Sequence, residues 1–533
     1  MEPRRAGGGA VEMLVDDAPA VSAQTPTIDD DHPPSVGDAL LPRWVRFTGW
    51  GLLGLQLLAM LAFSTVQYSR YALTADFANY SQAWWAIAHG HLDPYSSGLG
   101  VSFWKDNAEF ILWPLSLLYH VYPHPIDLLW VQDVAVVMTE LVAFGWIRKA
   151  IERAHGPIPH RAAPLLAVAA AVVLVVNPWV YETIAFDFHF EPIAALFCVL
   201  VGYNLWVGRI RRLWWLVPLA LICHVLAGFY LMGVGFSGLL AGPRTRRPGA
   251  AIAAIGLAWV FVFSAVGAAG VNGQFVTSSY GYLVGPHHGR IGLLDVVVGA
   301  LGHPGSILHV AASHWTVVLA FLIAFGAIGV LSPWGLGMAL VVLVPNTLDG
   351  SGLFVRYGAA FQSWPAMPFL LVGSVMVLLR LIGGGRRGRR VAAVAVAVWA
   401  TLLGELAFVA LPTIPKGWIS VDPPAAAALA RAETMIPPSA EVIASQGVIG
   451  RFSQRDSVYA FVEGHQTVPV NRRLVVFVLS PNEGVDDALP DHEATAAVGY
   501  VQTRLHAHLF VARSGVYAFA WSPSSLTTHV TLP

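Results

Sequence analysis

The chain has 533 residues, of which 56% are hydrophobic and only 12% are charged. Soluble domains carry about 25% charged residues, so this composition excludes an ordinary soluble protein and indicates a polytopic membrane protein. The formal net charge of −1 points to no charged partner, and we find no nucleic-acid-binding pattern. Cys198 and Cys223 both lie in apolar runs, so we expect neither a disulfide framework nor a catalytic thiol.

The first 42 residues differ from the rest of the chain. Residues 1–42 are polar, rich in Pro, Gly, Ala and Asp, and lack hydrophobic periodicity. Such a segment cannot bury enough apolar surface to fold, so we expect a disordered cytoplasmic tail. The first apolar run, 47–66, starts too late for a signal peptide and is long enough to span a bilayer. We therefore expect an uncleaved anchor.

Apolar runs of spanning length recur along the next 370 or so residues, since a membrane span needs about 20 mostly apolar residues. They lie near 47–66, 126–147, 162–180, 190–208, 213–226, 227–241, 249–271, 306–330, 334–346, 366–382 and 391–411. This predicts about 11 transmembrane helices within a membrane domain over 43–411. The two runs between 213 and 241 are short. The run 110–122 is also short and contains Pro114, so we expect it to be re-entrant or interfacial.

Every second connection between these runs is basic, which the positive-inside rule assigns to the cytoplasm. The basic residues are Arg43 and Arg46, then Arg148, Lys149, Arg153 and Arg161, then Arg209, Arg211 and Arg212, then Arg244, Arg246 and Arg247, and finally Arg386, Arg387, Arg389 and Arg390. The N-terminus is therefore expected in the cytoplasm and the C-terminus outside. The largest outside connection is the first, over 67–125.

From residue 412 the composition becomes that of a soluble domain. An Ala-rich helix is predicted over 423–435. Short β-type runs follow at 441–444, 457–462, 474–479, 508–512 and 516–521. The mixture of helix and strand patterns predicts a small α/β or α+β domain over 412–533, outside the membrane.

The first outside connection opens with a stretch that carries one carboxylate, Asp76. Apolar residues recur around it at helical spacing and form one stripe; they are Phe77, Tyr80, Trp84 and Ile87. Trp and Tyr favour the boundary between water and lipid. We therefore expect a short helix on the bilayer surface that holds Asp76 at the mouth of a membrane-embedded pocket. The alternative is that Asp76 only caps that helix.

Two further groups of side chains can join Asp76. Asp106 and Glu109 lie in the same outside connection, where one carboxylate can act as a general base and another can hold a divalent cation. The alternative is that they are solvated loop charges. The segment 186–192 alternates Asp187, His189 and Glu191 with aromatic residues, which suits ligands or hydrogen-bond donors of the same pocket. Its spacing names no ion, and an interfacial turn with aromatic anchors is the alternative.

Two acids lie inside the second predicted span. Asp133 and Glu140 are seven residues apart and face the same way. Acids within a bilayer are costly and usually functional, so they can form an ion or proton path. They can instead pair with polar groups on neighbouring helices. The partners considered are Glu405, His224, His309 and His314.

One cation is placed to meet a lipid phosphate. Arg356, followed by Tyr357, lies at the outer end of a predicted span, and a guanidinium binds phosphate in a fork. An Arg at this place can equally reach ordinary lipid headgroups.

Several stretches resemble one known family. The segment from Asp76 to Trp84, with Ala88-His89-Gly90-His91, resembles the opening motif of a bacterial membrane family, domain of unknown function 2079. The resemblance continues at 106–119, 128–132, 188–192 and 445–479, and it covers most of the chain beyond residue 60. That family in turn resembles the glycosyltransferase-C superfamily. Those polytopic enzymes move a sugar from a polyprenyl-phosphate donor to an acceptor outside the cytoplasm.

The resemblance implies roles for particular residues. Asp76 would be the general base or the carboxylate that positions the acceptor, and Asp106 the second acidic residue of the site. The residues whose chemistry and position in the sequence lead us to expect substrate or lipid-phosphate binding are Glu109, Asp187, His189, Glu191, Arg356 and Tyr357. Some members of that superfamily need a divalent cation and some do not; if this chain needs one, Mg or Mn, its ligands would be Asp76, Asp106 and His189. Two departures from the family pattern are Asn107, where a histidine is expected, and Asp133, where a small apolar residue is expected.

The function expected from these patterns is sugar transfer in the bacterial inner membrane. The donor would be a polyprenyl-phosphate sugar, and the acceptor a glycan or protein of the cell envelope. One alternative is a transporter or lipid flippase that uses Asp133 and Glu140. It lacks support from internal repeats or paired broken helices. Another is a non-catalytic envelope scaffold.

Overall fold

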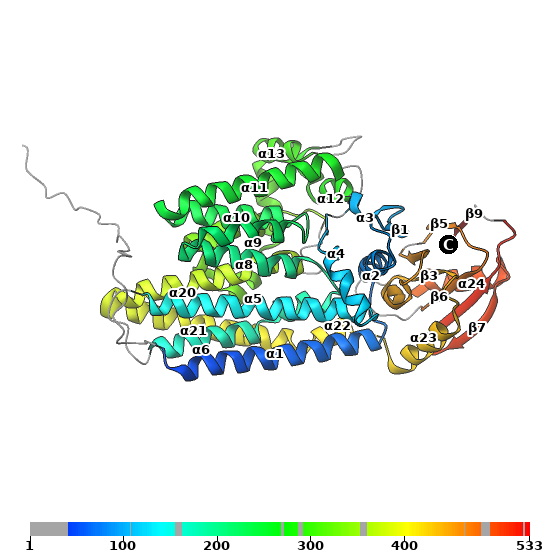
Figure 1. The fold of residues 1–533 in the computed structure, drawn as a ribbon, viewed down its shortest axis with the longest axis horizontal. Helices are drawn as coiled ribbons and strands as arrows, with labels where there is room; N and C mark the ends of the chain where they lie inside the picture. Colours follow the sequence, from blue (N-terminus) through cyan, green and yellow to red (C-terminus); the bar gives the residue numbers. More distant parts are fainter. Residues whose placement is uncertain are drawn as a thin grey trace, which may run out of the picture. The chain divides into compact units, whose positions relative to one another are not determined.

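The computed structural model describes residues 41–106, 108–154, 162–267, 271–285, 292–351, 360–419, 421–462, 464–480, 491–525 and 528–533. Nearly all of the tail predicted over 1–42 lies outside these residues. So do Asn107, Arg356, Tyr357 and the side chain of Asp106. The described residues belong to one compact unit, Leu40–Pro533 (Figure 1).

Among the described residues, six stretches are long and apolar enough to cross a membrane. They include α1 (Arg43–Ser69), α5 (Ile126–Glu152), α6 (Ala162–Val176) with α7 (Pro178–Ala185), α11 (Pro243–Gly267), α20 (Met367–Gly383) and α21 (Gly385–Ala410). A seventh is added if α13 (Leu293–Gly302) and α14 (Pro304–Ser313), bent by 94°, count as one span. The protein is therefore a mostly helical, multi-pass membrane protein. The count of eleven spans stays a prediction.

Shorter helices fill the remaining apolar runs. They are α8 (Glu191–Val207), α9 (Ile210–Leu221), α10 (Ala227–Ala241), α12 (Val271–Tyr280), η2 (Gly281–Leu283), α15 (Trp315–Phe325), η3 (Ala327–Leu331), α16 (Pro333–Met338), η4 (Ala339–Leu343), α17 (Val344–Thr347), α19 (Ala360–Ser363), η5 (Trp364–Ala366) and α22 (Ile414–Trp418). Four of the predicted spans thus correspond to apolar helices or helix pairs of 10–17 residues.

The first long helix buries one face, which includes polar residues, against its neighbours and exposes the opposite, apolar face. On α1 the buried residues recur every three or four positions, as a helix with one packed face requires. Gly49 permits close packing on α5, because a Cβ there would lie 2.3 Å from the ring of Phe144. The backbones of α10 and α11 also meet closely, since a Cβ on Gly256 would lie 2.4 Å from the Gly228 carbonyl oxygen. Small residues at helix contacts are typical of membrane helices.

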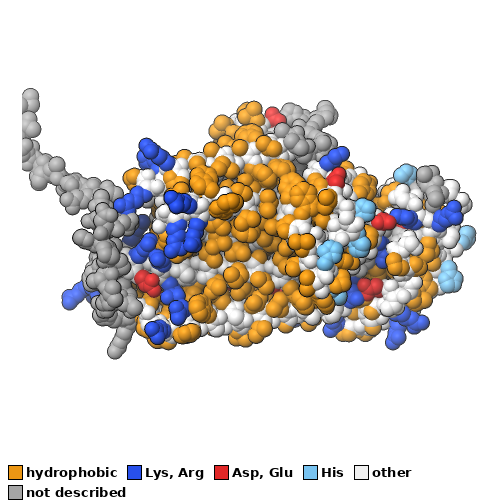
Figure 2. All heavy atoms as spheres, in the orientation of Figure 1, with side chains coloured by type: hydrophobic (Ala, Val, Ile, Leu, Met, Phe, Trp, Pro, Cys, Tyr) orange, Lys and Arg blue, Asp and Glu red, His pale blue; other side chains and the backbone are white. Residues whose placement is uncertain are grey.

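Surface composition agrees with a membrane setting. Figure 2 shows a broad belt of hydrophobic side chains over the helices on the face drawn. Lys and Arg side chains gather at the end of the helices away from the strands, at the left of that view. Most of the histidines visible on this face lie at the other end and on the strand domain.

The first connection, between α1 and α5, contains the amphipathic helix α2 (Ala75–Ala88). It continues with β1 (Tyr95–Ser96), β2 (Val101–Ser102), α3 (Phe103–Asp106), α4 (Leu112–Leu115) and η1 (Ser116–His120). The strands β1 and β2 form an antiparallel hairpin. The run 110–122 makes only short helical turns, and it exposes Trp113, Leu117 and Val121. This arrangement agrees with the interfacial alternative for that run.

The C-terminal part is a small sheet domain. In the described residues, β4 (Val458–Phe461), β3 (Glu441–Ser445), β6 (Val475–Leu479), β8 (Val516–Trp521) and β7 (His508–Arg513) form one sheet in that order. The pairs β4–β3 and β3–β6 are parallel, and the pairs β6–β8 and β8–β7 are antiparallel. The remaining elements are α23 (Pro423–Met435), η6 (Gln446–Phe452), α24 (Asp491–Thr503) and a second, two-stranded sheet of β5 (Thr467–Val470) and β9 (Thr528–Thr531).

Both faces of the larger sheet are covered. The central strands β3 and β6 are fully buried, and their side chains alternate between two cores, as the period of a strand requires. One core contains residues of α24. The other contains residues of α23 and η6 together with Tyr71, Ala72 and Ala78 of the first connection. The sheet domain therefore shares a hydrophobic core with the segment that carries Asp76.

Candidate functional site

The helix α2 begins beside Asp76. Thr74 is its N-cap, since the Thr74 hydroxyl accepts a hydrogen bond from the Asp76 backbone N–H at 3.3 Å. The alternative that Asp76 itself caps the helix is therefore wrong. Asp76 lies in the first turn, where the helix dipole favours a carboxylate, and 51% of its side chain is exposed. The Asp76 carboxylate is thus free of a capping role and open to solvent.

The turn between α7 and α8 meets this helix start. Asp187 adopts a left-handed backbone conformation, with φ at 88°, which is costly for a residue with a side chain. Its carboxylate accepts a hydrogen bond from the Thr74 backbone N–H at 2.6 Å. Gln132 of α5 fixes the same turn with both ends of its amide. It donates to the Asp187 carbonyl at 2.8 Å and accepts from the His189 N–H at 2.5 Å.

These contacts bring His189 to Asp76. The Nε2 atom of His189 lies 3.7 Å from Asp76 Oδ2. The imidazole is buried and stacks on Phe361, with 3.9 Å between ring centroids. Burial alone would lower the pKa of His189, but Asp76, Glu191 and Asp187 together raise it above its ordinary value. An exposed carboxylate therefore lies beside a buried imidazole whose pKa is raised.

A second acid–histidine pair lies beside the first. Glu109 is fully buried, and its Oε1 atom lies 3.2 Å from Nε2 of His224, in the break between α9 and α10. Glu191, the first residue of α8, lies 3.9 Å from the same nitrogen. The Leu226 backbone N–H donates to His224 Nδ1 at 3.0 Å, which leaves the ring proton on Nε2, facing both carboxylates. A backbone bond from Ile111 to Ile222 holds the two segments together.

Burial dominates the electrostatics of the two pairs. It raises the pKa of Glu109 to about 7, against the lowering effect of His224. Burial likewise raises the pKa of Asp187 to about 7, despite the hydrogen bonds from Thr74. Glu109 Oε2, Glu191 Oε2 and His189 Nδ1 form no hydrogen bond of good geometry with the described residues, and Glu109 Oε1 has only the ion-pair contact to His224 at 3.2 Å. Glu109 and Asp187 can therefore bind and release protons near neutral pH.

The structure brings together most of the residues that the sequence predicts on the outer side of the membrane. Three connections at one end of the helices supply these residues. The first connection carries Asp76 and Glu109, the turn from α7 into α8 carries Asp187, His189 and Glu191, and the break between α9 and α10 carries His224. We call this set the outer cluster. Asp106 ends α3, but its side chain lies outside the described residues, as do Arg356 and Tyr357. Their predicted roles therefore stay predictions.

A metal role for the cluster has no geometric support in the described residues. There, no group of three or more His, Cys, Asp or Glu side chains converges as metal ligands. Of the three predicted ligands, Asp76 and His189 lie together, with 3.7 Å between Asp76 Oδ2 and His189 Nε2. The third is Asp106, whose side chain lies outside the described residues.

The acids of α5 lie apart from the outer cluster and have different neighbours. Asp133 faces Ser64 of α1, and Glu140 faces Gln56 of the same helix. All four carboxyl oxygens are buried and form no hydrogen bond of good geometry with the described residues. Of the histidines considered as their partners, His224 pairs with Glu109 and Glu191 instead.

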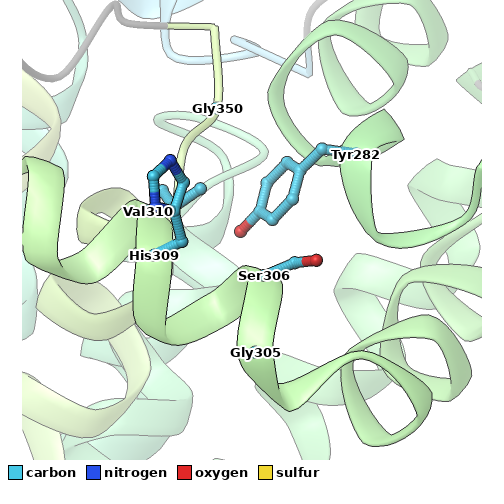
Figure 3. Close-up of a pocket in the computed structure, with 6 residues that line it drawn as sticks. All are labelled: Tyr282, Gly305, Ser306, His309, Val310 and Gly350. Carbon is cyan, nitrogen blue, oxygen red and sulfur yellow. The ribbon is translucent and has the colours of Figure 1, made fainter.

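A separate hollow of about 390 Å³ lies between η2, α14 and Gly350. Figure 3 shows Tyr282, Ser306 and His309 around it. The Tyr282 hydroxyl already donates to the Leu348 carbonyl. No member of the outer cluster lines this hollow.

Two residues of the arrangement were not predicted for this role. Gln132 enters the sequence analysis only as the last residue of the stretch 128–132 that resembles the family. A glutamine within an apolar helix is the feature that could have indicated its role. His224 was considered only as a partner for the acids of α5. Nothing in the sequence shows that the break between α9 and α10 packs against Glu109, because that contact joins segments more than 100 residues apart.

Comparisons with known proteins bear on the fold and the family. No curated protein matches the chain. ArnT from Cupriavidus metallidurans bound to undecaprenyl phosphate is similar in structure, with a TM-score of 0.46 and 14% sequence identity, covering 90% of this chain and 99% of ArnT. For ArnT in the apo state the TM-score is 0.45 and the identity 13%, covering 89% and 98%.

One family covers most of the chain. The family described as predicted membrane protein (DUF2079) matches residues 68–489, from the end of α1 into the sheet domain. The match includes Asp76, the turn at 187–189 and the first strands of the sheet domain. The chain therefore belongs to the DUF2079 family of membrane proteins.

Proposed function

We propose that this protein is a membrane glycosyltransferase that moves a sugar from a polyprenyl-phosphate donor to an acceptor outside the cytoplasm. The observation that carries the proposal is the half-exposed carboxylate of Asp76, 3.7 Å from the buried imidazole of His189. The helix ends hold this pair where water and lipid meet. The position of Asp76 soon after the first span supports the proposal, because the resemblance to glycosyltransferase-C enzymes leads us to expect a catalytic carboxylate there.

The proposed reaction needs one base and a good leaving group. The acceptor hydroxyl gives its proton to a carboxylate oxygen of Asp76 while its oxygen attacks the anomeric carbon of the donor sugar. The bond from that carbon to the phosphate oxygen breaks, and the lipid phosphate leaves with the electron pair. Because this leaving group is already an anion of low basicity, no nucleotide pocket is required.

His189 supports the base in this proposal. Nearby carboxylates raise the pKa of His189, and its Nε2 atom lies 3.7 Å from Asp76 Oδ2, where it can orient that carboxylate. Asp187 and Glu191 are nearly fully buried, so we assign them a supporting role: they fix the turn and stabilise the positive charge of His189, and they do not contact a substrate. Glu109 is likewise buried against His224. Asp106 remains our second acidic residue, and Arg356 with Tyr357 our lipid-phosphate clamp.

The proposed orientation puts the outer cluster and the sheet domain outside a bacterial inner membrane and the N-terminus in the cytoplasm. Lys and Arg side chains that gather at the opposite end of the helices support this orientation (Figure 2). The acceptor is then a glycan or protein of the cell envelope.

The test is sugar transfer by the purified full-length protein in proteoliposomes. We expect wild-type protein to transfer a labelled sugar from polyprenyl-phosphate sugar, and Asp76→Asn to lose at least about 1000-fold of that rate. Glu152→Gln, a half-exposed acid at the C-terminal end of α5, is the matched control and should retain full rate. Full activity in Asp76→Asn would overturn the proposed role.

The second candidate is a transporter or lipid flippase that uses Asp133 and Glu140. The observation that favours it is that all four oxygens of these acids are buried without a well-formed hydrogen bond to the described residues. It predicts transport that depends on these acids and is indifferent to Asp76.

A further inference from the structure

The helix α2 is held from two sides. Phe77, Tyr80 and Trp84 belong to the core of the membrane domain. Ala78 belongs to the core of the sheet domain, and Ala75 packs against that core. Asp76 lies between these two faces. Figure 1 shows α2 between the membrane helices and the strands.

Buried hydrogen bonds tie the middle of α2 to the sheet domain. The Gln82 amide donates to the carbonyls of Arg455 and Asp456 at 2.9 and 3.3 Å. Its oxygen accepts from the Ser97 backbone N–H at 3.1 Å. The Ser97 hydroxyl donates to the Val458 carbonyl at 2.7 Å and accepts from the Val458 N–H at 3.0 Å, at the start of β4. Buried polar groups with all their partners define one arrangement, because each lost bond leaves an unsatisfied group.

The start of α2 is tied to η6. The Gly450 N–H donates to the Leu73 carbonyl at 3.0 Å. A Cβ on Gly450 would lie 2.4 Å from the Leu73 Cβ and 3.0 Å from the Phe77 ring, so no larger residue fits without moving α2. Arg451 lies over the ring of Tyr71 at 4.0 Å and pairs with Glu433 of α23 at 2.6 Å.

These contacts lie next to the hydrogen bond from Thr74 to Asp187, which positions the start of α2 against the outer cluster. Leu73 is bonded to Gly450, and the next residue, Thr74, donates to Asp187 of the outer cluster. Asp76 follows two residues later. A helix of 14 residues is marginal by itself, so its position depends on what it packs against. The distance from Asp76 to His189 therefore depends on the sheet domain as well as on the membrane helices.

We propose that the C-terminal sheet domain is a working part of the transfer site, with Gln82, Ser97 and Gly450 as positioning residues that hold Asp76 against His189. The proposal rests on the proposed function of Asp76. It implies that anything that moves η6 and β4, including a partner bound to the sheet domain, changes the rate of transfer.

The test uses the full-length protein in proteoliposomes and three variants, Gly450→Val, Gln82→Leu and Ser97→Ala. The control is Arg472→Ala, which breaks an exposed ion pair with Asp456 on the same domain but leaves the three contacts intact. We expect Gly450→Val to lower kcat about 100-fold, since small misplacements of a reacting group have effects of that size. Gln82→Leu and Ser97→Ala should lower it about 10-fold, with the KM for the donor changed less than about two-fold.

A second measurement does not depend on activity. Amide hydrogen exchange over 71–88 should speed up at least about 10-fold in Gln82→Leu and Ser97→Ala, while exchange in α5 and α20 stays unchanged. If Gly450→Val does not fold, these two milder variants carry the test.

The outcomes separate the two proposals. Faster exchange in 71–88 with unchanged kcat would overturn the positioning role, and so would unchanged exchange. If the wild-type protein transfers no sugar, the proposed function fails and the positioning role falls with it. The exchange measurement then still decides whether the sheet domain holds α2.

Discussion

The protein holds acidic residues in two different settings. In the outer cluster, Asp76 and Glu109 each face a histidine, at 3.7 and 3.2 Å. In α5, Asp133 faces the hydroxyl of Ser64, and Glu140 faces the amide of Gln56 and lies near Tyr181. The first set lies on connections at the helix ends, and the second lies along the middle of a membrane helix.

The difference concerns what each set can do with a proton. An acid beside a histidine can exchange a proton with it, and one member of the outer cluster reaches solvent. Within the described residues, the acids of α5 form no ion pair with a histidine, and their carboxyl oxygens are buried. Such a group stabilises the fold best when it stays neutral and acts as a hydrogen-bonding link between helices. We therefore place the chemistry in the outer cluster and a structural role in α5.

The largest expected effect is on the rate of sugar transfer, and it comes from replacing His189, the histidine of the first pair. We expect His189→Gln to lower the transfer rate about 100- to 1000-fold, because the amide keeps a hydrogen-bond donor but loses the titratable group beside Asp76. Transfer kinetics in proteoliposomes measure it. Asp133→Asn, the matched change in α5, should alter the rate less than about three-fold. An equal loss in both variants would erase the contrast between the two sets.

The next effect is on stability, through the second pair. His224→Ala leaves Glu109 and Glu191 buried without their shared partner, which we expect to lower the free energy of unfolding by about 3 to 5 kcal/mol. Denaturant unfolding in detergent is the measurement. Ser64→Ala, beside Asp133, should lower it by about 1 kcal/mol. A loss below about 1 kcal/mol in His224→Ala would show that the pair is not energetically coupled.

A pH dependence follows from the raised pKa values of Glu109 and Asp187. In the unfolded chain these acids lose their protons near pH 4, whereas in the fold their pKa values are about 7. Between these pH values the folded state binds more protons, so stability falls as pH rises from about 4.5 to 7 and then levels off. Glu109→Gln should flatten this fall by about 3 kcal/mol at most. A melting temperature measured against pH checks it, and an unchanged slope would contradict the assignment.

The smallest effect is expected from α5. Replacing Glu140 by Gln exchanges a carboxyl group for an amide of the same shape that can still face Gln56, so stability should change by less than about 1 kcal/mol. The same denaturant series measures it. A large loss of stability, or a lost transport activity with intact folding, would move the functional site into the membrane helices and favour the transporter alternative.

The local features of this fold were predictable from sequence, and the distant contacts were not. The apolar stripe of α2, the helix over 423–435 and the strands near 441–444 and 474–479 follow from periodicity within one segment. The strands β5 and β9 were not predicted, because each has only four residues and Pro469 interrupts the first. The pairing of Glu109 with His224 and of Gln82 with β4 joins segments 100 to 400 residues apart. No spacing rule reaches that far.

One measurement tests the central claim most directly, which is that the outer cluster and not α5 carries the function. Asp76→Asn and Glu140→Gln are purified in the same way, shown to fold, and compared for transfer from polyprenyl-phosphate sugar in one proteoliposome assay. We predict that Asp76→Asn loses at least about 1000-fold of the rate and that Glu140→Gln stays within about two-fold of wild type. A wild-type rate in Asp76→Asn together with a lost activity in Glu140→Gln would contradict the account.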